Sequence, residues 1–273
     1  MIWVISDIHG AFKTLEKLIQ RVKSSDSDAS FVFVGDYVDR GIHNKEVVDL
    51  VIKLQAEEGA IALRGNHDNV VDWLLNDEKY QDGRRVGHCM GNMSEFVRGV
   101  PDFHNMISWW RRNGLDETLV SYGASDALYN PKASPVDIAR EFQDKVPQAH
   151  KDFFRNLPLA WESETHFACH GYFRPRMEPR NIQSLPNYII DEILWSRFSD
   201  YDLRTPVLWE QIGIFGHTPV QSMGASAPIK AGKIRLIDTG VHLNEYICAY
   251  CTDRDDWILQ ATDSRDFNVL GEK

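Results

Sequence analysis

The chain has 273 residues and a formal net charge of −10, with 43% hydrophobic and 26% charged residues, which is an ordinary composition for a globular protein. The negative charge argues against general binding to nucleic acids and against adsorption to anionic membranes, because both depend on basic surfaces. No apolar run of about 18 residues predicts a transmembrane helix, and the apolar start of the chain is too short for a signal peptide, so we expect a cytoplasmic protein.

Three strand–loop–helix units open the sequence. The apolar runs Ile2–Ser6, Phe31–Val34 and Ala60–Leu63 predict strands. Each is followed by a polar, glycine-bearing loop and then by apolar residues at helical spacing. Strands that alternate with helices favour βαβ crossovers and a mostly parallel sheet. In such a sheet ligands bind at the carboxyl ends of the strands, which is where the polar loops fall.

The pattern changes between about residues 80 and 160. Segments with helical spacing are separated there by glycine and proline breaks. We interpret residues 80–160 as a helical insertion that covers the sheet edge, within a single domain of residues 1–273. The neighbouring Trp109 and Trp110 are expected to pack inside this helical part.

Strand patterns return in the last third of the chain. Thr165–Cys169 and Gly213–Phe215 predict strands that lead to His170 and His217. Three closely spaced β runs follow: Ile234–Ile237, Tyr246–Thr252 and Trp257–Ala261. We expect these three runs to form a second, antiparallel-rich sheet.

The chain has four cysteines. Cys248 and Cys251 have the spacing of a zinc ribbon, but no second close pair would complete such a site. Because we expect a cytoplasmic protein, all four cysteines are expected to be reduced and structural.

Six potential metal ligands follow successive apolar runs, each on a glycine-bearing turn: Asp7, His9, Asp36, Asn66, His170 and His217. Mixed oxygen and imidazole donors suit Mn, Fe or Zn. Asp7 and His9 are two residues apart, so on extended backbone both side chains point the same way and can bind one ion. Asp36 can bridge two ions through its two carboxylate oxygens, and the other three residues can complete the second ion. Two adjacent divalent ions would attract a phosphate ester and favour its hydrolysis.

Three further residues are candidates for handling the substrate. His67 directly follows Asn66, so it lies at the edge of the predicted metal centre, where it can protonate a leaving alkoxide. Asp39 can orient the His67 ring and hold it protonated. Arg40 offers a planar guanidinium to phosphate oxygens. A salt bridge between Asp39 and Arg40 within the loop is the alternative role for that pair.

These motifs resemble those of the calcineurin-like metallophosphoesterases. The segments that carry the resemblance span residues 6 to 240: Asp7-Ile8-His9, Gly35-Asp36-Tyr37-Val38-Asp39-Arg40-Gly41, Gly65-Asn66-His67-Asp68, His170-Gly171 and Gly216-His217. The Asp39-Arg40-Gly41 variant is similar to the phosphoprotein phosphatase branch. Within that branch the chain is most similar to small bacterial and phage-type enzymes, the lambda-phosphatase-like serine/threonine phosphatases, and residues 113–123 also resemble the bacterial pattern.

The resemblance implies a fold of the mixed α/β (α+β) class, a four-layer αββα sandwich. It implies a dinuclear centre of two divalent ions, with Mn expected and Fe or Zn as alternatives. Hydroxide held by the two ions would attack phosphorus directly, without a phosphoenzyme. In the lambda-phosphatase-like group Leu194-Trp195-Ser196-Arg197 would carry a second phosphate-binding arginine, so Arg197 is expected to bind phosphate together with Arg40. An ordinary helix-end cation is the alternative role for Arg197.

The implied activity is that of a metal-dependent phosphomonoesterase. The expected substrate is a protein or peptide phosphorylated on serine or threonine, with phosphotyrosine as a further option. A nucleotide polyphosphatase, such as a symmetrical diadenosine tetraphosphate hydrolase, is the alternative, because its substrate presents a phosphoryl group to the same ions. A non-catalytic interaction module is a minor alternative. The remaining histidines lack ligand spacing and are expected to be surface or core residues: His43, His88, His104, His150, His166 and His242.

Overall fold

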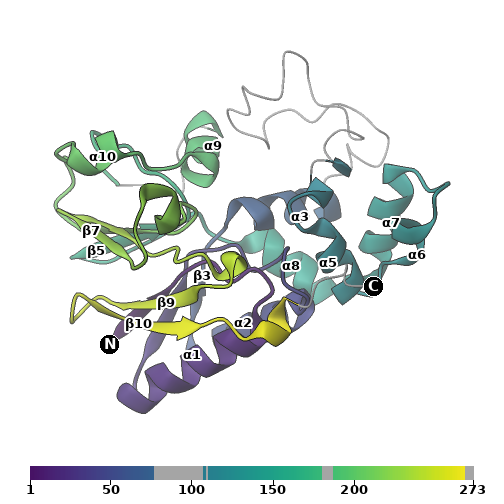
Figure 1. Cartoon of the computed structure of the whole chain (residues 1–273), viewed down its shortest axis with the longest axis horizontal. Helices are drawn as coiled ribbons and strands as arrows, with labels where there is room; N and C mark the ends of the chain where they lie inside the picture. The colour runs from purple at the N-terminus through teal and green to yellow at the C-terminus, as the bar shows by residue number, and fades with distance from the viewer. Residues whose placement is uncertain (77–106, 109, 180–186, 268–273) are drawn as a thin grey trace.

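The computed structural model describes residues 1–76, 107–108, 110–179 and 187–267 (Figure 1). Its strands form two five-stranded sheets with the strand orders β10-β9-β1-β2-β3 and β4-β5-β6-β8-β7. The first sheet contains β1 (Ile2–Ile5), β2 (Ser30–Phe33), β3 (Ile61–Ala62), β9 (Tyr246–Cys251) and β10 (Asp256–Ala261). The second sheet contains β4 (Ala160–Glu162), β5 (His166–Cys169), β6 (Ile212–Phe215), β7 (Ile229–Ala231) and β8 (Ile234–Leu236).

The helices cover the outer faces and one end of the sheets. They are α1 (Phe12–Ser25), α2 (Asn44–Glu58), α3 (Asn66–Asn76), α5 (Leu115–Ser121), α6 (Asp126–Tyr129), α7 (Pro135–Lys145), α8 (Gln148–Asn156), α9 (Asn187–Trp195) and α10 (Asp200–Arg204). Short 3-10 turns add η3 (Val220–Met223), η4 (Val241–Leu243) and η5 (Ser264–Asp266). Among the described residues, no helix combines the length and the apolar composition needed to cross a membrane.

Alternating side chains of the central strands enter different hydrophobic layers. In β1, Trp3 and Ile5 pack in the cluster that contains the buried face of α1, whereas Val4 packs between the two sheets. In β5, Phe167 packs in the cluster that contains Ile193 of α9, whereas the next residue, Ala168, packs between the two sheets. This alternation is expected because successive side chains of a strand point to opposite faces.

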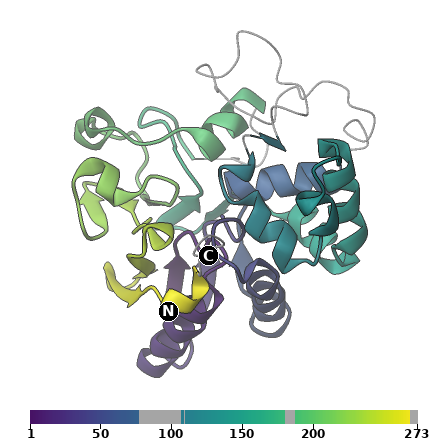
Figure 2. The ribbon, with the colours of Figure 1, turned by 45° about the vertical axis from the view of Figure 1, so that its right-hand side comes forward.

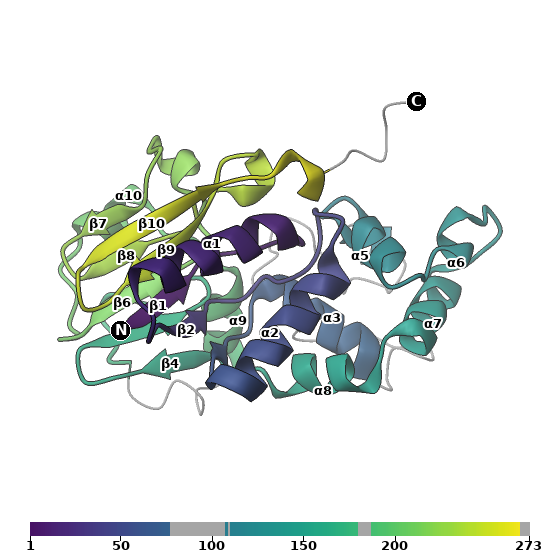
Figure 3. The same cartoon turned by 90° about the horizontal axis from the view of Figure 1, so that it is seen from below.

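The resulting order of layers is helix, sheet, sheet, helix. Figure 1 shows this order from α1 at the bottom to α9 and α10 at the top, and Figure 3 shows α1 in front of the first sheet. The structure therefore confirms the predicted four-layer αββα sandwich.

One part of the predicted sheet arrangement is wrong. The β runs near residues 246–252 and 257–261 do not join the second sheet, because β9 pairs antiparallel with β1 and β10 pairs antiparallel with β9. Of the three predicted β runs, only β8 lies in the second sheet, where it is parallel to β6 and antiparallel to β7. The close spacing of β9 and β10 correctly indicates a hairpin, but spacing alone does not specify the strand to which a hairpin pairs.

The helices α5, α6, α7 and α8 gather at one end of the molecule, beside α2 and α3 (Figure 2). They lie in the range that we predicted to be a helical insertion. Residues 77–106 and Trp109 lie outside the described residues. Trp110 is completely buried, as expected. Three of the four cysteines are buried and reduced, and Cys89 lies outside the described residues.

The parallel pairs β1–β2 and β5–β6 run in register, so the carboxyl ends of the two strands in each pair meet at one edge of their sheet. The loops that leave these ends carry the residues predicted to bind metal. The stacking of the two sheets brings both edges to a common region, which becomes the candidate site.

Candidate metal centre

The six predicted ligands lie on loops that follow five different strands. Asp7 and His9 follow β1, Asp36 follows β2, and Asn66 begins α3 after β3. On the second sheet, His170 directly follows β5 and His217 lies two residues after β6. All six are buried, with exposed fractions between 0% and 8%: Asp7, His9, Asp36, Asn66, His170 and His217.

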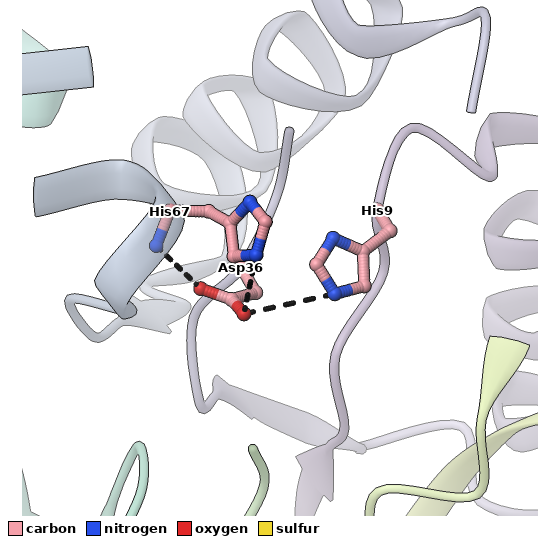
Figure 4. Close-up of side chains that lie close together, drawn as sticks. All are labelled: His9, Asp36 and His67. Atoms are coloured by element: carbon pink, nitrogen blue, oxygen red, sulfur yellow. Dashed lines mark hydrogen bonds and ion pairs between the residues drawn. The ribbon is translucent and has the colours of Figure 1, made fainter. Parts of the chain in front are cut away.

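The carboxylate of Asp36 lies at the centre of this group. Its Oδ2 atom is 3.4 Å from His170 Nε2, 3.6 Å from His9 Nε2 and 4.0 Å from His67 Nε2. Figure 4 shows two of these three imidazoles, those of His9 and His67, on either side of the carboxylate. Two imidazoles from separate loops, His9 and His170, and one from the first turn of α3, His67, thus converge on one oxygen atom.

Two groups of side chains have the geometry to hold a cation, and Asp36 belongs to both. One group is His9, Asp36 and His67, and the other is Asp36, His170 and His217; within each group the ligand atoms lie within 4.8 Å of one another. A carboxylate shared by two neighbouring groups fits the bridging role predicted for Asp36. The first group includes His67, to which we assigned proton transfer.

Each predicted histidine ligand is oriented by a hydrogen bond to the backbone. Nδ1 of His9 donates to the Val38 carbonyl at 3.0 Å, and Nδ1 of His170 donates to the Val34 carbonyl at 3.0 Å. For His217 it is Nε2 that donates, to the Trp195 carbonyl at 3.1 Å. A carbonyl only accepts hydrogen bonds, so the other ring nitrogens of His9 and His217 keep their lone pairs for a metal. Nε2 of His170 faces the Asp36 carboxylate; burial would lower the pKa of His170, but the charge of Asp36 outweighs it and raises this pKa to about 9.

The two remaining predicted ligands contact the same set of loops. Both carboxylate oxygens of Asp7 accept a hydrogen bond from the His217 backbone N–H, at 3.1 and 3.2 Å. Oδ1 of Asn66 lies 2.9 Å from His170 Nε2. Asp7 and Asn66 therefore each link a loop of the first sheet to a loop of the second.

The loops depart from ordinary backbone geometry. His9, Asp36 and His217 have φ angles of 48°, 56° and 58°, in the left-handed region that non-glycine residues rarely occupy. Such a conformation costs about 1–3 kcal/mol per residue and persists only where surrounding contacts enforce it. Gly65 is required for the same packing, since a Cβ atom there would collide with Asp36.

Asp68 supplies much of this enforcement, and its role was not predicted. Its carboxylate accepts hydrogen bonds from the backbone N–H groups of Asp36 at 2.7 Å, Tyr37 at 3.1 Å and Gly65 at 2.9 Å. Burial, together with the neighbouring Asp36 charge, raises the pKa of Asp68 to about 7. Its position in the Gly65–Asp68 motif was the only signal in the sequence.

The electrostatics of the centre favour a bound cation. Burial, followed by the charge of Asp238, raises the pKa of Asp7 well above its usual value, and burial also raises the pKa of Asp238 to about 6. Burial lowers the pKa values of His9 and His217 well below the usual value, which favours the neutral imidazole that binds metals. Buried carboxylates beside neutral imidazoles are the donor set that a divalent ion would stabilise. The residues present therefore fit a dinuclear centre.

His67 and Asp39 form a buried pair beside the centre. Nδ1 of His67 donates to Asp39 Oδ2 at 2.7 Å, and Asp39 is completely buried. The second oxygen of Asp39 accepts a hydrogen bond from Thr118 at 2.5 Å. The carboxylate of Asp39 is thus directed at His67 and Thr118.

A cavity of about 170 Å³ opens onto these groups. Both predicted phosphate-binding arginines, Arg40 and Arg197, line it. Nε of Arg40 is buried and has no hydrogen-bond partner among the described residues. The Arg40 guanidinium therefore keeps an N–H that makes no hydrogen bond within the described residues.

Two titratable residues of the cavity wall, Asp238 and His242, were not predicted as site residues. Asp238 is buried, and it follows β8 as the predicted ligands follow their own strands, a signal that could have identified it. His242 lies on η4 with its ring 5.2 Å from that of His9, in an edge-to-face arrangement. Burial, followed by the charge of Arg40, lowers the pKa of His242 to about 3. Nothing in the spacing of the sequence distinguishes His242.

Comparison with known proteins agrees with this geometry. A family model described as calcineurin-like phosphoesterase matches residues 1–244. The chain belongs to this family. The predicted family is therefore confirmed, and with it a hydrolase of the phosphoesterase type.

Individual relatives are more distant. A segment of 68 residues is 39% identical to the serine/threonine-protein phosphatase PP2A-like PPG1 of Candida albicans; it spans 24% of this chain and only 16% of that protein. This segment agrees with the resemblance to the phosphoprotein phosphatase branch.

Two solved structures share the fold at low sequence identity. A putative diadenosine tetraphosphatase has a TM-score of 0.59 and 17% identity, over 96% of this chain and 93% of that one. A Saccharomyces cerevisiae protein serine/threonine phosphatase with similarity to human PP5 has a TM-score of 0.51 and 14% identity, over 96% and 79% of the two chains. At these identities the likeness shows the fold alone.

Proposed function

We propose that this protein is a metal-dependent phosphomonoesterase that dephosphorylates serine and threonine side chains of proteins. The observation that carries the proposal is the position of Asp36, whose Oδ2 atom lies within 4.0 Å of the Nε2 atoms of His9, His67 and His170. The segment shared with a PP2A-like phosphatase supports a protein substrate.

The cofactors in this proposal are two divalent ions, with Mn²⁺ as the expected metal. Asp7, His9 and Asp36 would hold one ion. Asp36 would also serve the second ion, together with three residues of other loops: Asn66, His170 and His217. When bound, such ions lower the pKa of water and neutralise charge on the phosphoryl oxygens.

The side chains around the ions would bind the substrate and move a proton. Arg40 and Arg197 would bind phosphoryl oxygens, because both line the cavity beside the proposed ligands. His67 would protonate the leaving side-chain oxygen. Since Asp39 holds Nδ1 of His67, it is Nε2, on the side of Asp36, that faces the reacting group.

The size of the cavity favours a phosphate ester whose bulk stays outside. Pockets that enclose small molecules usually measure about 300–1,000 Å³, whereas the described residues here enclose about 170 Å³. A phosphoryl group on a protein side chain needs no larger cavity volume. A dinucleoside polyphosphate would need further surface for its two nucleosides.

The experiment that tests the proposal compares substrates directly. The protein, loaded with Mn²⁺, is assayed for phosphate release from phosphoserine, phosphothreonine and phosphotyrosine peptides, and for cleavage of diadenosine tetraphosphate. We expect a kcat/KM at least about ten-fold higher on a serine or threonine phosphopeptide than on the dinucleotide. Preference for the dinucleotide would identify a nucleotide polyphosphatase instead. An Asp36→Ala variant, purified in the same way, controls for contaminating phosphatases.

A further inference from the structure

Helix α5 contacts the loop that carries the proposed catalytic residues. Three residues, spaced by four and then three positions, contact that loop or the first turn of α2 that follows it: Gly114, Thr118 and Ser121. The carbonyl of Gly114 accepts a hydrogen bond from the Arg40 N–H at 3.4 Å, and Oγ of Ser121 accepts one from the Lys45 N–H at 2.9 Å. This spacing places all three on one side of the helix.

The middle contact is made to the Asp39 side chain itself. The Thr118 hydroxyl accepts a hydrogen bond from the Asp39 backbone N–H at 3.0 Å and donates one to Asp39 Oδ1 at 2.5 Å. The other carboxylate oxygen, Oδ2, accepts the hydrogen bond from His67 Nδ1 at 2.7 Å. Both oxygens of Asp39 are therefore held, one by each neighbour.

These hydrogen bonds hold the Asp39 carboxylate in one orientation. Asp39 and Thr118 are both 0% exposed, so bulk water has no access to replace the hydroxyl. Asp39 has a φ angle of 71°, and it is in this left-handed conformation that its own N–H meets the Thr118 hydroxyl. A hydrogen bond to a fixed carboxylate fixes the plane of the His67 ring and the direction of its Nε2 atom.

We propose that Thr118 is a positioning residue for the proton donor: its hydroxyl holds the Asp39 carboxylate so that His67 Nε2 faces the leaving oxygen of the substrate. The inference rests on the proposed function. In the step concerned, the P–O ester bond breaks, the leaving oxygen keeps the bonding electron pair, and it takes the proton from His67 Nε2. Helix α5 would thereby contribute to the chemistry through Asp39 and His67.

The test uses the different needs of two leaving groups. An alkyl leaving group, as in a phosphoserine peptide, needs the proton, whereas the aryl group of p-nitrophenyl phosphate leaves well without it. Thr118→Val keeps the shape and removes the hydroxyl. We expect it to lower kcat on the phosphoserine peptide by about 10- to 100-fold, which is part of the rate enhancement that a general acid supplies. On p-nitrophenyl phosphate we expect a loss of less than about three-fold, with KM for both substrates little changed.

Two further variants separate positioning from packing. Thr118→Ser keeps the hydroxyl and should retain kcat on both substrates within about three-fold. Ser121→Ala is the matched control, because it removes a hydroxyl of the same helix that binds only backbone and the Glu46 side chain; it should leave the ratio of the two kcat values unchanged. If Thr118→Val does not fold, Thr118→Ala is compared with Thr118→Ser, which restores the hydroxyl alone.

The inference is overturned if Thr118→Val slows both substrates equally or slows neither, or if Thr118→Ser is as impaired as Thr118→Val. His67→Asn is assayed alongside. If His67→Asn selectively slows the alkyl substrate and Thr118→Val does not, the positioning role is wrong and the proton donor stands. If His67→Asn shows no selectivity, the proposed proton donor is wrong, and the role of Thr118 falls with it.

Discussion

His67 lies between two carboxylates that have different roles. Asp39 holds its Nδ1 atom at 2.7 Å, and Asp36 lies 4.0 Å from its Nε2 atom. Replacing His67 with Asn removes the proton donor, and we predict a loss of about 100- to 10,000-fold in turnover of alkyl phosphates. Aryl phosphates should lose much less, because their leaving groups need little protonation. Steady-state kcat on the two substrate types checks this, and equal losses would reject the role.

Asp68 is predicted to be a major determinant of stability, since three backbone N–H groups depend on its carboxylate. Asp68→Asn presents an amide N–H₂ to some of these donors and leaves them unsatisfied. We expect the free energy of unfolding, measured in urea, to fall by about 2–3 kcal/mol. The control is Asp200→Asn, at an exposed residue whose ion pair with Arg204 measures 3.9 Å, and this change should alter stability by less than about 0.5 kcal/mol. Similar losses in both variants would contradict this role.

Site residues that share a local motif could be predicted from the sequence. Site residues that come together only when the chain folds could not. Asp36 and His67 stand in recognisable motifs on predicted loops. Thr118 meets Asp39 from 79 positions along the chain, and the resemblance of residues 113–123 to the bacterial pattern assigned no role to this threonine. His242 reaches the cavity on a 3-10 turn that the sequence does not indicate.

At the scale of elements, a network around Asp255 joins the two sheets. Asp255 lies between β9 and β10 of the first sheet, and Arg235 lies on β8 of the second. The Arg235 guanidinium donates to both carboxylate oxygens, at 2.8 and 3.2 Å, and the Tyr250 hydroxyl donates to one of them at 2.6 Å. Partial burial would raise the pKa of Asp255, but the hydrogen bonds from Arg235 and Tyr250 outweigh it and lower the pKa to about 2.

The lowered pKa of Asp255 makes its contribution to the free energy of unfolding depend on pH. Because folding lowers the pKa of Asp255 from 3.8 to about 2, its ionised form stabilises the fold fully above pH 3.8, and this contribution is lost as the pH falls toward 2. Asp255→Asn should therefore be less stable than the wild type at pH 7, and the difference should narrow between pH 4 and pH 2. Urea unfolding of both proteins at several pH values checks this. A difference that stays constant down to pH 3 would contradict it.

Strand pairing could be predicted where the paired strands are close together in the sequence. The apolar runs that alternate with segments of helical spacing indicated the first three strands and their parallel pairing. The β9–β10 hairpin was assigned to the wrong sheet, because its pairing with β1 joins residues about 245 positions apart and leaves no local pattern in the sequence.

In the whole molecule, the candidate centre is a second region, besides the Asp255 network, where polar groups join the two sheets. Asp7, His9 and Asp36 come from the first sheet, and His170 and His217 from the second. We propose that residues 1–273 form one domain, since ions at this place would join both halves. Unfolding should then be a single cooperative transition.

Metal removal should accordingly destabilise the whole chain. Ligands that bind only the folded state add about 2.7 kcal/mol at a concentration 100 times their Kd. We expect a chelator to lower the melting temperature and abolish activity, and Mn²⁺ to restore both better than Mg²⁺, because imidazole donors favour the softer ion. Thermal melting and phosphate release, measured on the same samples, check this. Full recovery with Mg²⁺ alone would count against the histidine ligands.

We propose that two neighbouring ions share the Asp36 carboxylate. Elemental analysis of catalytically active protein measures the metal content per chain. We expect two tightly bound divalent ions per chain, with activity proportional to their content, and a marked loss of bound metal in Asp36→Ala. Fully active protein that retains well under two ions per chain would contradict it.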